Sequence, residues 1–238
     1  MKPHTIKRFR AVLVAIALLL PSCSRETSES STQDAGDKNK PVICTVNYPL
    51  AYFAQRIGGE HLTIEFSSIK GDPAFWQPKA EDVNKFQVAD LILINGASYA
   101  KWLSIASLPQ SKIVNTSAAF KDQYIDQSNS IKHAHGPSGE HDHGRIAFTT
   151  WLDPALAIMQ AKAICRAFVR EFPGHEAYFE KRYEELKLDL QKIDNALEHL
   201  LSDKQDVPLI MSHPIYQYLE RRYGINAKRV LGTRCDSK

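Results

Sequence analysis

Ala89-Asp-Leu-Ile-Leu-Ile-Asn95 is the stretch of sequence that decides the fold class. A short continuous apolar run of this kind is typical of a strand that is buried on both faces in a parallel sheet. Helices are predicted before and after it, over 79–88 and 98–107, and another strand over 112–115. Strands that alternate with helices predict an α/β fold with a mostly parallel sheet.

The residues before this stretch continue the same alternation. A short β-rich run covers 42–46, and the composition of 50–57 favours a helix. Gly58 and Gly59 end that helix, and residues 61–69 are a second strand candidate. The first α/β unit is therefore expected to begin at about Pro41.

A long helical region follows later in the chain. Asp153 is a good N-cap and Pro154 fits the first helical position, so we predict a helix from there to about Glu171. Pro173 and Gly174 interrupt it. The next helix has charged faces and one apolar stripe, with spacings of three and four residues. The stripe consists of Tyr183, Leu186, Leu190, Ile193, Leu197 and Leu200.

The last residues predict the start of a second α/β unit. Residues 207–211 and 225–231 are strand candidates, and a helix over 215–223 is closed by Gly224. The sequence ends at Lys238, so we expect this second lobe to be shortened. A lobe with so few strands buries too little apolar surface to be stable alone.

The first residues have the pattern of an export signal. A basic segment precedes the apolar run of residues 11–20, which is too short to span a bilayer comfortably. Leu20-Pro-Ser-Cys23 then resembles a bacterial lipobox, which makes Cys23 the expected site of lipid attachment. The alternative is an ordinary signal peptide with an incidental cysteine, and both predict export. Residues 24–40 are polar and are predicted to be a flexible tether.

The overall composition is that of a globular protein. Of the 238 residues 43% are hydrophobic and 24% are charged, and the formal net charge is only +3. No broad footprint for nucleic acid is evident from this charge. Cys44, Cys165 and Cys235 show no CxxC spacing, so neither a zinc knuckle nor a full disulfide framework is indicated.

Several short segments in a fixed order resemble the metal-binding family of ABC solute-binding proteins, which delivers zinc or manganese. They are Gly58-Gly59, Gly71-Asp72-Pro73 with Pro78, Ala89-Asp90-Leu91 through Asn95-Gly96, the histidine-rich loop 131–144, Trp151-Leu152-Asp153-Pro154, and Ser212-His213 with Tyr223-Gly224. The resemblance implies two α/β lobes joined by one long helix, with a metal ion in the cleft between the lobes. The implied division is an N-terminal lobe over 41–172, a linking helix over 173–203 and the start of a C-terminal lobe over 204–238.

The family site uses three histidines and a carboxylate, and this sequence departs from that set. The position of the first histidine, after an Asp-Pro pair, is occupied by Ala74. The position of the second, two residues before Trp-Leu-Asp-Pro, is occupied by Thr149. The third histidine matches His213, and the carboxylate comes from a later part of the second lobe. A lone histidine in a Ser-His-Pro context is also compatible with a hydrogen-bonded turn residue.

These replacements weaken the expected cleft site. Alanine has no lone pair and a threonine hydroxyl is a weak zinc ligand, whereas a tight closed site needs about four good donors. Asp72 and Gln77 lie near Ala74 in the sequence, and Asp153 lies near Thr149. Their side-chain oxygen atoms are possible replacement ligands. Phe75 and Trp76 beside Ala74 either pack between the lobes or line a pocket for a less polar or chelated ligand.

The loop 131–144 contains its own cluster of potential metal ligands. The four are His133, His135, His141 and His143, with acidic residues between them. Neutral imidazole binds zinc, copper or nickel, so we expect weak metal capture by this loop. The alternative is a solvated loop without a physiological ligand.

The resemblance therefore implies an extracytoplasmic solute-binding component of a zinc or manganese ABC importer. Its expected partners are a divalent metal ion and an ABC permease in the cytoplasmic membrane, and its expected location is the periplasm or the outer face of that membrane, on a lipid anchor. One alternative is a degenerate or truncated relative that acts as a metal buffer or accessory protein. A zinc hydrolase is disfavoured, because the sequence has no HExxH motif and no nucleophile elbow.

Overall fold

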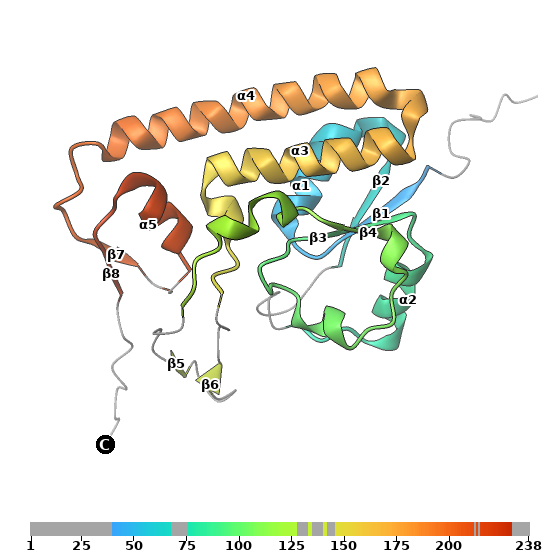
Figure 1. Cartoon of the computed structure of the whole chain (residues 1–238), viewed down its shortest axis with the longest axis horizontal. Helices are drawn as coiled ribbons and strands as arrows, with labels where there is room; N and C mark the ends of the chain where they lie inside the picture. Colours follow the sequence, from blue (N-terminus) through green and yellow to red (C-terminus); the bar gives the residue numbers. More distant parts are fainter. Residues whose placement is uncertain are drawn as a thin grey trace, which may run out of the picture. The chain divides into compact units, whose positions relative to one another are not determined.

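A four-stranded parallel sheet forms the centre of the N-terminal part of the chain (Figure 1). The computed structural model describes residues 40–67, 76–127, 133–134, 140–141, 146–211, 213 and 215–229. The strands are β1 (Val42–Thr45), β2 (Thr63–Phe66), β3 (Leu91–Ile94) and β4 (Ile113–Asn115), in the spatial order β2-β1-β3-β4. The apolar run of residues 89–95 is thus an inner strand, which explains its continuous hydrophobicity.

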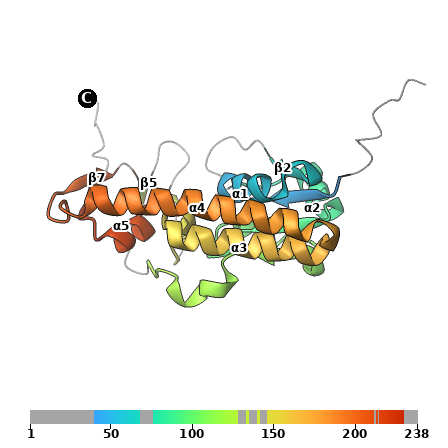
Figure 2. The same cartoon turned by 90° about the horizontal axis from the view of Figure 1, so that it is seen from above.

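The helices lie on both sides of this sheet. Figure 1 shows α3 and α4 on one side, and α2 on the other. The bounds are α1 Tyr48–Gly58, α2 Ala80–Val88, α3 Pro154–Glu171, α4 Glu176–Leu201 and α5 Gln217–Tyr223. Figure 2 shows α3 and α4 side by side, and both pack on α1. The main hydrophobic core lies between these helices and the sheet.

Two short strand pairs complete the described elements. β5 (His133–Ala134) and β6 (Glu140–His141) are antiparallel, within the region expected to be a loop. β7 (Leu209–Met211) and β8 (Ala227–Arg229) are parallel and are connected through α5, which makes a βαβ unit. Short 3-10 helices occur at 59–61, 101–104, 110–112, 118–123, 150–152 and 173–175.

The helix predicted over 98–107 is wrong. Only Lys101–Ser104 is helical there, and it is a short 3-10 helix. Three consecutive residues before it, from Gly96 to Ser98, have positive φ angles, a conformation that an α-helix cannot include. Trp102 in this segment is buried against Phe86, with ring centroids 5.0 Å apart. Packing of one large ring has therefore outweighed the helical composition.

The predicted apolar stripe is buried only in the first half of α4. Tyr183, Leu186 and Leu190 are buried, but Ile193 is 51% exposed and Leu200 is 56% exposed. The buried face continues instead through Asp194, four residues after Leu190. The second half of α4 therefore contributes a carboxylate to the interior, and α5 packs on it.

Candidate functional site

The carboxyl ends of the central strands hold a cluster of buried polar side chains. Asn47 follows β1, Asn95 follows β3 and Thr116 follows β4, and all three are at most 1% exposed. The side-chain amides of Asn47 and Gln160 both donate to Oδ1 of Asn95, each at 3.2 Å. Gln160 also donates to Oγ1 of Thr116 at 3.0 Å. Because parallel strands end at the same edge of a sheet, these residues meet there and satisfy one another.

This cluster positions the turn at residues 148–150. Asn95 donates through Nδ2 to the carbonyl oxygen of Phe148 at 2.9 Å, and Thr150 donates to Oε1 of Gln160 at 3.2 Å. Thr149 between them is 4% exposed. A turn bonded on both sides to a satisfied buried network has little freedom to move.

Thr149 connects this turn to the segment that carries His213. Its hydroxyl donates to the carbonyl oxygen of Ile215 at 2.5 Å. Ile215 is two residues after His213, which is exposed. Thr149 and His213, which stand at the second and third expected ligand positions, therefore lie on segments that contact each other. The Thr149 hydroxyl donates its hydrogen bond to the backbone of the second segment.

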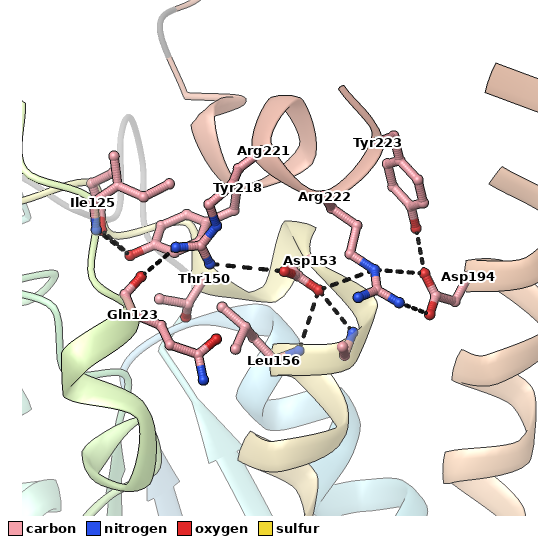
Figure 3. A network of polar contacts seen from close by, with 12 residues as sticks. Gln123, Ile125, Thr150, Asp153, Leu156, Asp194, Tyr218, Arg221, Arg222 and Tyr223 are labelled. Carbon is pink, nitrogen blue, oxygen red and sulfur yellow. Dashed lines mark hydrogen bonds and ion pairs between the residues drawn. The ribbon is translucent and has the colours of Figure 1, made fainter. Parts of the chain in front are cut away.

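Asp153 is an N-cap and not a free ligand. Its Oδ1 accepts from the backbone amides of Ala155 and Leu156, at 2.9 and 3.4 Å. Arg222 lies 3.6 Å from the same oxygen, and Arg221 lies 3.9 Å from Oδ2 (Figure 3). A cation would be repelled by both guanidinium groups at this position.

Arg222 extends this network from Asp153 to α4. It forms two hydrogen bonds with the carboxylate of Asp194, one of them from Nε to Oδ1 at 3.0 Å, and Tyr223 donates to Oδ1 at 2.8 Å (Figure 3). Burial alone would raise the pKa of Asp194, but the hydrogen bonds from Arg222 and Tyr223 outweigh it and hold the pKa below its ordinary value. The pKa of Tyr223 is raised by burial and by this hydrogen bond.

We expect the Asp194 carboxylate to make stability depend on pH in acid. Because its folded pKa is lowered, its contribution is fully present above the unfolded value of about 3.9 and is lost as the pH falls through the folded value. Replacing Asp194 by asparagine should cost about 2 kcal/mol at neutral pH. Urea unfolding from pH 7 to pH 3 should show this difference shrinking below about pH 4. A difference that stays constant over this range would contradict the assignment.

A known family model matches most of this chain. The family model ZnuA, described as zinc-uptake complex component A, periplasmic, matches residues 42–237. The chain belongs to the ZnuA family. The resemblance read from the sequence segments is thereby confirmed.

Curated relatives of this ZnuA-family chain are named as metal-binding lipoproteins. The zinc-binding lipoprotein AdcA of Streptococcus pneumoniae strain R6 is 26% identical over 232 residues, which cover 94% of this chain and 45% of AdcA. The manganese ABC transporter substrate-binding lipoprotein PsaA of the same species is 25% identical and covers 90% of this chain and 68% of PsaA. The chain thus spans about half the length of AdcA.

Solved structures show that the ZnuA-family chain has the same fold. The metal-dependent lipoprotein YcdH from Bacillus subtilis superposes with a TM-score of 0.69 at 22% identity, over 82% of this chain and 68% of that chain. The zinc-bound ZnuA-like domain of Streptococcus pneumoniae AdcA gives 0.67 at 21% identity, over 84% of this chain and 70% of that domain. The predicted α/β fold class is confirmed.

The other predicted site residues of this ZnuA-family chain have different outcomes. Cys23, Asp72, Ala74, Phe75, His135 and His143 lie outside the described residues, and of His133 and His141 only the backbone is described. Gln77 is exposed. Trp76 is half-buried and packs edge to face on Trp102, with ring centroids 5.8 Å apart, against the N-terminal core and not between the lobes.

Within the described ranges of the ZnuA-family chain, no group of three or more histidine, cysteine, aspartate or glutamate side chains is arranged to hold a metal ion. Cys44 and Cys165 are buried thiols without a disulfide. Burial raises their pKa values, to about 12 for Cys44 and about 11 for Cys165, so neither is a ready thiolate donor. None of the described helices is both long enough and apolar enough to span a membrane.

The residues that organise this region were not predicted from the sequence as site residues. Asn95 and Gln160 each stand alone as a polar residue in an apolar stretch, and this was a usable signal for a buried hydrogen bond. Asp194 and Arg222 gave no such signal, because charged residues are frequent on both of their helices. Their pairing depends on residues 28 positions apart in the chain.

Proposed function

We propose that this protein binds a divalent metal ion, zinc or manganese, outside the cytoplasmic membrane and delivers it to the permease of an ABC importer. The observation that carries the proposal is the match of the ZnuA family model to residues 42–237. The names of AdcA and PsaA as zinc- and manganese-binding lipoproteins support the same class of ligand. The role is binding and transfer, and we assign no catalytic step.

The hairpin of β5 and β6 is the proposed first point of metal capture. Its register places His133 opposite His141 and Ala134 opposite Glu140. Directly opposed residues in an antiparallel pair have Cβ atoms about 5 Å apart, within the span that two imidazoles need to share one ion. His135 and His143 would add two further donors. We propose that this loop collects metal weakly and at several sites.

The base of this loop is closed by backbone contacts. Asp126 and Ile146 form an antiparallel bridge, and the amide of Ala147 donates to the carbonyl oxygen of Ile125 at 2.9 Å. Within residues 131–144 the described strands β5 and β6 pair with each other and belong to a sheet separate from the central one. The loop can therefore be shortened without disturbing the turn that contains Thr149.

His213 is the proposed donor of the delivery site. In support, Thr149 of the 148–150 turn donates to the carbonyl oxygen of Ile215, two residues after His213, and this turn is bonded to Asn95 at the carboxyl end of β3. Open α/β sheets bind their ligands at this edge. One imidazole does not make a tight site, so the partners of His213 must include oxygen donors such as Asp72 or solvent.

We further propose that Cys23 carries a lipid and that residues 24–40 act as a tether. The names of the relatives as lipoproteins support this anchor. The location would be the periplasm or the outer face of the cytoplasmic membrane, within reach of a permease.

A competitive titration with zinc and with manganese tests the proposal. The chain lacking residues 131–144 should bind one zinc ion, more weakly than a closed four-donor site, and His213→Ala should weaken this binding more than about tenfold. A chelator of known affinity measures both constants. Equal affinity with and without His213→Ala would make His213 a structural residue. Binding that disappears with the loop would instead favour the metal-buffer interpretation.

A further inference from the structure

The junction between α5 and the N-terminal lobe is made by direct hydrogen bonds of the protein. Tyr218 donates to the carbonyl oxygen of Ala147 at 3.0 Å and accepts from the amide of Ile125 at 3.3 Å. Arg221 donates to the carbonyl oxygen of Gln123 at 2.6 Å. With the Thr149 hydroxyl on Ile215, the segment 215–222 is bonded to three separate stretches of the first lobe. We call this set of contacts the α5 junction.

The side chains that α5 contributes to the α5 junction, Tyr218, Arg221 and Arg222, lie on one face of the helix. Figure 3 shows Tyr218 and Arg221 directed toward Gln123 and Ile125, and Arg222 between Asp153 and Asp194. Tyr218 is fully buried in a small apolar cluster with Phe120, Ala147 and Leu156. The junction thus combines an apolar centre with polar contacts around it. Such an arrangement favours one fixed position of α5.

We propose that Thr149 is a latch, a hydrogen bond of the protein itself that holds the His213 segment against the 148–150 turn. Thr149 is 4% exposed, and its two neighbours in the turn are held through the Phe148 carbonyl oxygen and the Thr150 hydroxyl, so the Thr149 hydroxyl is oriented toward Ile215. The latch is the contact of the α5 junction closest in sequence to His213. It holds the chain two residues after that histidine against the turn.

The latch reduces the part of the metal-binding free energy that would be used to order the His213 segment. Where a site is assembled by its ligand, part of the binding free energy is used to order the segments. Here the Thr149 hydroxyl joins the 148–150 turn to Ile215 by a hydrogen bond of the protein itself. A metal ion would then bind to a segment already in position. The inference concerns the conformation of the chain and stands independently of the proposed transport function.

The matched variants are Thr149→Val, Thr149→Ser and Thr45→Val. Valine has the shape of threonine without the donor, and serine keeps the donor. Thr45 is also buried, and its hydroxyl donates to the carbonyl oxygen of Glu65 inside the first lobe. Thr45→Val therefore controls for loss of a buried hydroxyl donor without touching the turn that carries the latch.

Hydrogen exchange of the full chain, measured by mass spectrometry without added metal, tests the latch. The latch donates to a carbonyl oxygen, so its loss is detected through α5, which begins two residues after Ile215 and in which the Glu220 amide donates to the carbonyl oxygen of Tyr216. Peptides covering 215–224 should exchange about fivefold faster in Thr149→Val, the factor expected for loss of one hydrogen bond, and at the original rate in Thr149→Ser. Thr45→Val should leave this segment unchanged. Unchanged exchange in Thr149→Val, or the same acceleration in both valine variants, would overturn the proposal.

Zinc titration of the same variants separates this inference from the proposed function. If Thr149→Val accelerates exchange as expected but no variant binds zinc, the latch is supported and the transport proposal fails. If the protein binds zinc but exchange at 215–224 does not respond to Thr149→Val, the latch is overturned and the transport proposal is unaffected.

Discussion

Replacing Gly96 by alanine should lower the free energy of unfolding by about 3 kcal/mol, from backbone strain and overpacking together. Gly96 has a φ of +75°, in the left-handed region, and follows the buried strand β3. A Cβ atom there would lie 2.1 Å from Oγ of Ser117 and 2.4 Å from Oδ1 of Asn115. Those atoms bond to each other and to Tyr124, so they cannot move without breaking buried hydrogen bonds.

The matched control for Gly96→Ala is Gly174→Ala. A Cβ atom at Gly174 meets nothing within 4 Å, and its φ is not in the left-handed region. This variant should leave the unfolding free energy within about 0.5 kcal/mol of the original. Urea unfolding followed by circular dichroism measures both. Equal effects of the two substitutions would show that the space around Gly96 does not constrain the fold.

Replacing His133, His135, His141 and His143 together by alanine should remove most of the weak zinc binding of the full chain. Imidazole nitrogen is the donor that zinc uses most readily after thiolate, and alanine offers none. The fold should be unaffected, because the residues lie beyond the bridge between Asp126 and Ile146. Isothermal titration calorimetry should show a lower stoichiometry with unchanged circular dichroism.

The control for the loop histidines is His199→Ala. His199 is exposed on α4, so its removal changes the histidine count without touching the loop or His213. Its zinc stoichiometry should equal that of the original chain. If the quadruple variant also keeps the original stoichiometry, the loop has no part in metal capture and is a solvated surface segment.

Two residues considered from the sequence as sources of oxygen ligands are engaged by other protein groups. Asp153 is bonded to two backbone amides and lies beside Arg221 and Arg222. Thr149 donates its hydroxyl to Ile215. Both residues therefore help to place α5 and the segment before it, and we expect the donors for a bound metal ion to come from elsewhere.

The sequence by itself determined the α/β class, the family and most of the strands and helices. Continuous apolar runs such as 91–94 and helix caps such as Asp153 favour a strand or a helix through interactions between residues that are close in the sequence. The sequence also predicts, through the family resemblance, that Ala74 and Thr149 occupy two of the family's ligand positions, and this stays a prediction.

Only the tertiary structure decided the contacts that join distant segments. The Thr149 hydroxyl and its acceptor are 66 positions apart, and Arg222 and Asp194 are 28 apart. The composition of 98–107 favours a helix, but the segment forms only a short 3-10 helix in which Trp102 is buried. The buried face of α4 continues through Asp194, which is paired with Arg222, and not through Ile193. Hydrogen bonds and packing of this kind depend on which elements become neighbours in space, and local sequence pattern carries no record of that.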